Sequence, residues 1–185
     1  MPVITLVGYR GTGKTTVAAA LAARLGCEWV DADVVLEQRV GTSIAALVRE
    51  RGETTFRDEE STILAELLAS CAGVLATGGG VVLRPLNRER LRAHGRPIVW
   101  LTASCAVIRR RLAADPHTAS RRPALAGADP LDEIDSTVAH RAPLYREVAD
   151  AMIDTGAVEP ADVTGRIVEW LAAGAAPGRL WEDAC

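Results

Sequence analysis

Short apolar runs alternate along this chain with longer segments in which apolar residues recur at helical spacing. The runs at 3–7, 74–76, 97–101 and 151–153 are almost wholly apolar, which is typical of strands buried on both faces of a parallel sheet. The pattern also predicts a shorter strand at 28–30, and helices at 17–25, 34–40, 42–51, 86–93, 106–113, 131–148 and 161–173, with one more after residue 53. We expect Gly52 to end the helix at 42–51 and Pro143 to interrupt the helix at 131–148. The alternation of strands and helices predicts an α/β fold.

The first apolar run leads directly into a glycine-rich motif. Residues 8–15 satisfy the pattern G-x-x-x-x-G-K-[ST], with a predicted strand before them and a predicted helix after them. In this motif backbone N–H groups surround an oligophosphate, the lysine reaches the β and γ phosphates, and the hydroxyl holds Mg²⁺. A simple glycine turn is the structural alternative, and the strand and helix on either side disfavour it. The sequence therefore predicts an ATP site with Gly11, Thr12, Gly13, Lys14, Thr15 and Thr16, in which Thr15 is a Mg²⁺ ligand.

Lys14 is the only lysine among the 21 lysine and arginine residues. A compact ammonium and a planar guanidinium are not interchangeable. The use of lysine at this one position indicates a working phosphate site.

Composition and charge narrow the class of protein. A chain of 185 residues, 49% hydrophobic, suits one domain, and we expect that domain at 1–173 with a disordered tail at 174–185. A net charge of -3 argues against nucleic acid as a partner. No apolar run approaches the roughly 20 residues that cross a membrane. The four cysteines and three histidines show no metal-binding spacing, so we expect reduced thiols in a cytoplasmic protein. We also expect a monomer, because the sequence shows no clear hydrophobic surface stripe.

Polar residues follow the second and third predicted strands. Asp31 and Asp33, two apart in an extended segment, would face the same side, although Asp33 also suits the N-cap of the next helix. Arg57 lies among acidic residues, and it is either a surface ion-pair partner of Glu53 or Glu60 or an anchor for a substrate carboxylate. Three successive glycines, 78–80, end the third strand, where ligands bind in open α/β sheets.

The segment at 114–127 follows a helix that carries Arg109, Arg110 and Arg111, and it contains Arg121 and Arg122. A run of arginines is usually a solvated face. A polar loop that carries arginine at this place is also suited to be a lid that closes over phosphates. We therefore predict a lid at about 114–127 that brings arginine side chains to the phosphates.

These motifs together resemble the shikimate kinase family over about residues 3–173. The resemblance is carried by six motifs in the order of the family: 8–16, Asp31-x-Asp33, Phe56-Arg57-x-x-Glu60, 78–80, Arg122-Pro123 and 141–145. It implies a P-loop NTPase-type three-layer αβα fold, with a five-stranded parallel sheet of order 2-3-1-4-5 and a lid loop. It also implies transfer of the γ-phosphoryl group of ATP to the 3-hydroxyl of shikimate, in the pathway to aromatic amino acids.

The resemblance implies roles for single residues as well. Lys14, Asp33 and Arg122 would be catalytic, with Asp33 a candidate base that also binds substrate hydroxyls. The shikimate carboxylate would be held by Arg57 and Arg141 and by the backbone at Gly79 and Gly80, while Asp31 would support Mg²⁺ beside Thr15. The lid reads Arg-Pro-Ala-Leu where the family usually has Arg-Pro-Leu-Leu.

Two alternatives have different sequence requirements. Another small-molecule kinase of the same fold, such as gluconate kinase, would share the phosphate motif but would not need two arginines for a carboxylate. A GTP-dependent switch would need an N-K-x-D motif, which a chain with Lys14 as its only lysine does not contain.

Overall fold

The computed structural model describes residues 1, 3–114 and 134–175. Five parallel strands form one sheet in the order β2-β3-β1-β4-β5. The strands are β1 (Ile4–Val7), β2 (Trp29–Asp31), β3 (Val74–Ala76), β4 (Ile98–Thr102) and β5 (Ala151–Asp154). The predicted fold class and strand order are confirmed.

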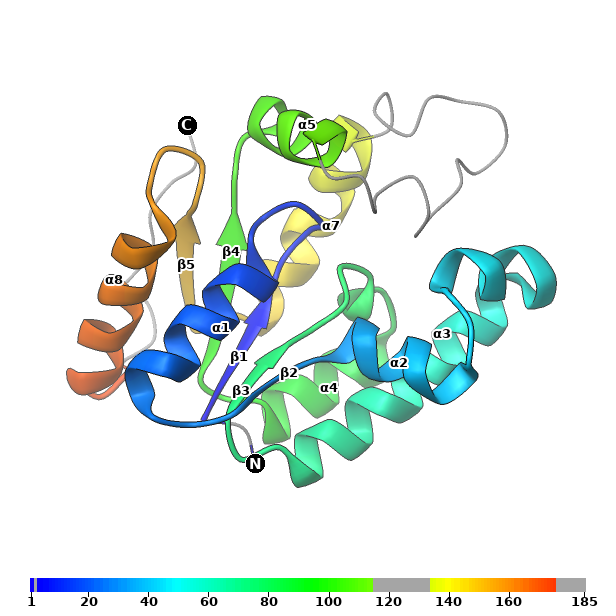
Figure 1. The fold of residues 1–185 in the computed structure, drawn as a ribbon, viewed down its shortest axis with the longest axis horizontal. Helices are drawn as coiled ribbons and strands as arrows, with labels where there is room; N and C mark the ends of the chain where they lie inside the picture. Colours follow the sequence, from blue (N-terminus) through cyan, green and yellow to red (C-terminus); the bar gives the residue numbers. More distant parts are fainter. Residues whose placement is uncertain (2, 115–133, 176–185) are drawn as a thin grey trace.

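Helices cover both faces of the sheet, which gives three layers (Figure 1). Ile4 and Leu6 of β1 point to the face covered by α1 (Lys14–Leu25) and α8 (Pro160–Ala172). Val7 points to the opposite face, which is covered by α3 (Ile44–Ser70), α4 (Pro85–His94) and α7 (Ile134–Val148). Both faces are buried because each strand alternates its apolar side chains between them. The short 3-10 helix η1 (Val81–Leu83) follows β3, and α5 (Cys105–Ala114) follows β4.

Helix α1 begins at Lys14, three residues earlier than the apolar pattern predicts. Gly13 precedes it in the left-handed conformation, with φ of 86°. Among the described residues, no side chain caps this end of the helix by a hydrogen bond. The helix N-terminus therefore points its partial positive charge into the phosphate-binding loop (residues 8–15).

Helix α2 (Ala32–Val40) and the first part of α3 lie beside the sheet (Figure 1). Gly52 has φ of 84° and ψ of 162°, so it bends α3 sharply without a separating loop. The expected end of the first helical part at Gly52 is thus confirmed, and the second helical part begins directly after it. A small apolar cluster joins α2 to both parts of α3. Its buried residues are Leu36, Ile44, Leu47, Phe56 and Ile63.

Pro143 lies inside α7, and the helix continues through it to Val148. The predicted interruption is therefore wrong, because a proline removes one backbone donor and need not end a helix held by tertiary packing. The predicted lid at 114–127 lies outside the described residues except for Ala114. Of the predicted tail, Gly174 and Ala175 are described, and the Ala175 N–H donates to the Trp170 carbonyl. Within the described residues, no helix is long and apolar enough to cross a membrane.

Candidate active site

The phosphate-binding loop curls tightly at the carboxyl end of β1. Gly8 has φ of 145°, and a Cβ there would lie 2.2 Å from the Leu101 carbonyl oxygen, so only glycine fits without displacement. The Lys14 ammonium donates to the carbonyls of Gly8 at 2.8 Å and Tyr9 at 2.9 Å. Lys14 therefore folds back over the loop, where it is placed to meet a bound phosphate.

Asp31 connects this loop to β2. The Thr15 hydroxyl donates to Asp31 Oδ2 at 2.7 Å, and Asp31 Oδ1 accepts from the Asp33 backbone N–H at 3.0 Å. Asp31 is thus the N-cap of α2, so the interpretation of Asp33 as the cap is wrong. The extended geometry assumed for the two aspartates also fails, because β2 ends at Asp31 and Asp33 lies in the helix.

The Asp33 carboxylate lies against the glycine loop (residues 78–80) that follows β3. A Cβ built on Gly78 would lie 2.6 Å from Asp33 Oδ1 and 2.8 Å from Glu60 Oε1. Two carboxylates and a side-chain-free backbone therefore meet at this point, beside the phosphate-binding loop. Gly79 and Gly80 continue this side-chain-free backbone.

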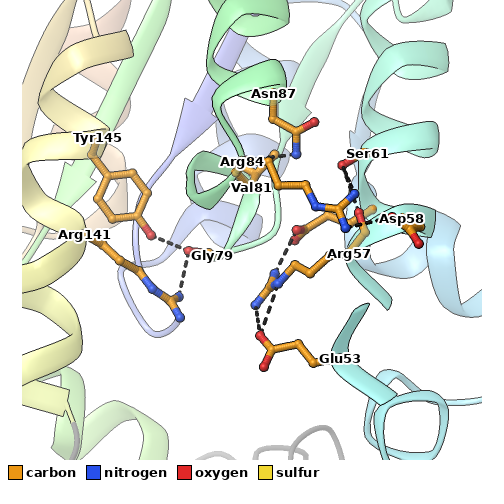
Figure 2. A network of polar contacts seen from close by, with 11 residues as sticks. Glu53, Arg57, Asp58, Ser61, Gly79, Val81, Arg84, Asn87, Arg141 and Tyr145 are labelled. Carbon is orange, nitrogen blue, oxygen red and sulfur yellow. Dashed lines mark hydrogen bonds and ion pairs between the residues drawn. The ribbon is translucent and has the colours of Figure 1, made fainter. Parts of the chain in front are cut away.

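Arg57 is buried in this region, with 6% of its surface exposed. The expected pairing with Glu53 and Glu60 is confirmed, but its expected place on the surface is wrong. NH1 of its guanidinium donates to Glu60 Oε2 at 2.8 Å. NH2 donates to Glu53 Oε1 at 3.0 Å, a contact that Figure 2 shows. Burial alone would lower the pKa of Arg57, but the two carboxylates outweigh it and the pKa is raised. Arg57 therefore stays charged in a site with little solvent.

The glycine loop receives side chains from two directions. A Cβ on Gly80 would lie 2.0 Å from NH1 of Arg57, so the guanidinium packs directly on the backbone. From α7, Arg141 donates to the Gly79 carbonyl at 3.0 Å, and the Tyr145 hydroxyl donates to the same oxygen (Figure 2). Burial raises the pKa of Tyr145, which keeps its hydroxyl protonated as a donor. Two arginines thus flank one glycine loop.

A cavity of about 160 Å³ opens on the other side of the phosphate-binding loop. Its lining includes Thr12, Gly13, Thr16, Arg111 and Thr155. Arg111 donates to the Gly11 carbonyl at 3.2 Å and to the Thr155 carbonyl at 2.6 Å, so it joins α5 to the loop after β5. Among Arg109, Arg110 and Arg111, the structure places Arg111 at this cavity.

The structure brings most of the predicted site residues together. One set forms the end of the phosphate-binding loop and the start of α1: Gly11, Thr12, Gly13, Lys14, Thr15 and Thr16. A second set lies around this loop: Asp31, Asp33, Arg57, Gly79, Gly80 and Arg141. Arg122 lies outside the described residues. No group of three or more histidine, cysteine, aspartate or glutamate side chains suited to a metal is present in the described part of the chain. Sequence reasoning gave no role to Tyr145 or Thr155, although Tyr145 stands in the quoted 141–145 motif.

The pairing of Arg57 with two acids predicts unequal stability effects. Glu60 has only 5% of its side chain exposed, against 47% for Glu53. We expect Glu60→Ala to lower the free energy of unfolding by about 3 kcal/mol, because removal of one partner leaves a buried charge poorly compensated. Glu53→Ala is the matched control at the same arginine, and we expect a loss below about 1 kcal/mol. Urea unfolding measures both, and equal losses would contradict the burial argument.

Comparisons with known proteins show the family of this chain. A family model for shikimate kinase matches residues 10–172. The chain belongs to the shikimate kinase family. It is 41% identical over 172 residues to the shikimate kinase of Xanthomonas euvesicatoria pv. vesicatoria, covering 93% of each chain. It is 45% identical over 150 residues to that of Rhodopirellula baltica, covering 81% of this chain and 80% of the relative.

Solved structures of the family have the same fold. The shikimate kinase from Acinetobacter baumannii, in complex with shikimate, has a TM-score of 0.85 and 36% identity, covering 92% of this chain and 93% of that one. A gluconokinase from Sinorhizobium meliloti has a TM-score of 0.54 and 19% identity, covering 93% of this chain and 92% of that one, which shows a shared fold alone. The expected family is therefore confirmed, and with it ATP-dependent phosphotransferase activity of the shikimate kinase type.

Proposed function

We propose that this chain transfers the γ-phosphoryl group of ATP to the 3-hydroxyl of shikimate, which gives shikimate 3-phosphate and ADP. One observation carries the proposal: Arg57 and Arg141 approach the same glycine loop from different helices, beside the phosphate-binding loop. Two guanidinium groups beside a glycine backbone suit a carboxylate, for which arginine has matching geometry. The complex of the Acinetobacter baumannii relative with shikimate supports this choice of acid.

On the nucleotide side, the triphosphate would bind in the phosphate-binding loop, with Lys14 on its outer phosphates. The cavity beside Arg111 and Thr155 would take the adenine base, since it adjoins the same loop at Thr12 and Gly13. We further propose Arg122 as the lid arginine that neutralises the transferring phosphoryl group.

Asp33 would accept the proton of the attacking hydroxyl. Its carboxylate lies next to Gly78, in the same glycine loop that Arg57 and Arg141 contact. An acid held at that loop would therefore present its hydroxyls near Asp33. Catalysis would depend mainly on positioning the two substrates and neutralising phosphate charge, as in other phosphoryl transfers.

The donor set also suits Mg²⁺, because Thr15 and Asp31 offer hard oxygen ligands 2.7 Å apart at the edge of the phosphate site. When bound there, Mg²⁺ would neutralise phosphate charge. The described residues supply one hydroxyl and one carboxylate, in line with the preference of Mg²⁺ to keep waters and substrate phosphates as its other ligands.

The test is ADP release with ATP and Mg²⁺, compared for shikimate, gluconate, the methyl ester of shikimate and no acceptor. We expect turnover with shikimate in the usual kinase range of about 1 to 100 per second. The neutral ester should need a much higher concentration, because it lacks the carboxylate. Turnover with gluconate and none with shikimate would favour the alternative kinase.

Arg141→Ala and Arg57→Lys test the carboxylate-binding arginines. We expect each to raise the KM for shikimate roughly tenfold to a hundredfold, because one hydrogen bond to a charged group is worth about 1.5 to 3 kcal/mol. The KM for ATP should change by less than about threefold. The methyl ester is the control, since its KM should be nearly the same for wild type and variants. A raised KM for ATP with unchanged shikimate binding would refute the assignment.

We also propose that the enzyme works in the cytoplasm as a monomer. Cys27, Cys71 and Cys105 form no disulfide within the described residues, which is in keeping with a reducing compartment. The molar mass in solution, measured by light scattering, tests the monomer.

A further inference from the structure

The two arginines of the proposed carboxylate site are held in different ways. Arg57 has two carboxylate partners, and its guanidinium carbon lies 4.7 Å from the centroid of the Phe56 ring. Arg141 has no carboxylate partner among the described residues, and its NH1 donates to the Gly79 carbonyl. Its Nε is buried and has no hydrogen-bond partner in that part of the chain. Another contact must therefore help to orient the Arg141 guanidinium.

The ring of Tyr9 supplies that contact. The Arg141 guanidinium carbon lies 5.5 Å from the centroid of the Tyr9 ring, within the range in which a cation over an aromatic face is attracted. Arg10 also approaches the ring, at 5.8 Å. The negative face of an aromatic ring can stabilise a guanidinium that no carboxylate neutralises.

Tyr9 is itself firmly held. Only 6% of its surface is exposed, and it packs with Ile108, Leu112 and Ile134. Its carbonyl accepts from the Thr12 hydroxyl at 2.7 Å and from the Lys14 ammonium at 2.9 Å. The ring is therefore fixed to the phosphate-binding loop and offers a rigid surface to the longer and more flexible arginine.

We propose that Tyr9 is a positioning residue, whose ring holds the Arg141 guanidinium in place to bind the carboxylate of the acceptor acid. The inference rests on the proposed function, because Arg141 acts there as a carboxylate ligand. Tyr9 itself would contact neither the carboxylate nor the reacting atoms. It acts through Arg141, and so its effect should appear in acid binding.

The first test compares Tyr9→Leu with Tyr9→Phe. Leucine removes the aromatic face, whereas phenylalanine keeps it without the hydroxyl. We expect Tyr9→Leu to raise the KM for shikimate about threefold to thirtyfold, the range set by the strength of a cation–π contact. The KM for ATP and kcat should stay within about twofold, and Tyr9→Phe should behave as wild type. A purely structural role predicts instead that both KM values rise together, and that result would overturn the proposal.

A double-mutant cycle with Arg141→Ala separates this inference from the proposed function. If Tyr9 acts through Arg141, adding Tyr9→Leu to Arg141→Ala should leave the KM for shikimate unchanged. The same rise in both backgrounds would overturn the role of Tyr9. If Arg141→Ala alone had a normal KM for shikimate, the carboxylate assignment itself would fail. If Arg141→Ala raised that KM and Tyr9→Leu did not, only the present inference would fail.

Tyr9 is buried, so Tyr9→Leu risks disturbing the fold. Replacement of Tyr9 by pentafluorophenylalanine keeps an aromatic ring but reverses the charge of its face. We expect this variant to raise the KM for shikimate relative to Tyr9→Phe, with thermal stability and the KM for ATP unchanged. Equal KM values for shikimate in the two ring variants would overturn the proposal, whatever the outcome for leucine.

Discussion

Lys14→Met is expected to lower kcat by about a hundredfold or more, since removal of one donor aimed at developing charge typically costs 10² to 10³. Lys14 Nζ bridges the carbonyls of Gly8 and Tyr9, which places its charge over the phosphate-binding loop. Methionine has similar length and no charge. Steady-state turnover with shikimate and ATP measures the effect, and circular dichroism checks the fold.

Lys14→Arg is the matched control, because it keeps the positive charge. In the wild-type chain a single nitrogen reaches both carbonyls, at 2.8 and 2.9 Å. A planar guanidinium spreads its donors over three nitrogens and is longer, so we expect Lys14→Arg also to lose at least about tenfold in kcat. Full activity in Lys14→Arg would mean that charge alone matters. Near-normal kcat in Lys14→Met would remove Lys14 from the mechanism.

The fold was predictable because its strongest signals are local. The strand at 74–76 is fully buried, and its apolar run gave the observed bounds, Val74–Ala76. The motif at 8–15 specified a strand, a loop and a helix in order. Gly8 of this motif lies so close to the Leu101 backbone that a side chain would not fit there. Each of these features is decided within a few residues of chain.

Burial and long-range contacts were harder to predict. Arg57 has acids three and four residues away, a pattern shared by exposed helix faces, and only the packing of α3 against the glycine loop makes it a buried ion pair. The contact between Arg111 and Thr155 was equally hard to predict, because these residues are 44 positions apart in the sequence. They come together only when β5 takes its place at the edge of the sheet. The N-cap of α2 is Asp31, although Asp33 was the predicted cap. This error has a local cause, since aspartate suits the N-cap at either position.

Asp33→Asn is the second large expected effect, a loss of about 10² to 10⁴ in kcat, the usual contribution of a general base. Asparagine has nearly the same shape but cannot take the proton of the attacking hydroxyl. The Asp33 backbone N–H still donates to Asp31 in the variant, so α2 keeps its cap. We therefore expect the stability and the KM for ATP to change little.

Asp31→Asn is the control that distinguishes a base from a metal partner. Asparagine is also a good N-cap, so this variant should keep the start of α2, and its loss should come from weaker support of Mg²⁺ beside Thr15. Raising the Mg²⁺ concentration should restore part of the activity of Asp31→Asn and none of that of Asp33→Asn. If Asp33→Asn kept kcat within tenfold of wild type, Asp33 would only orient the substrate. If Mg²⁺ rescued both variants alike, the two aspartates would share one role at the metal, and the base would have to be sought elsewhere around the glycine loop.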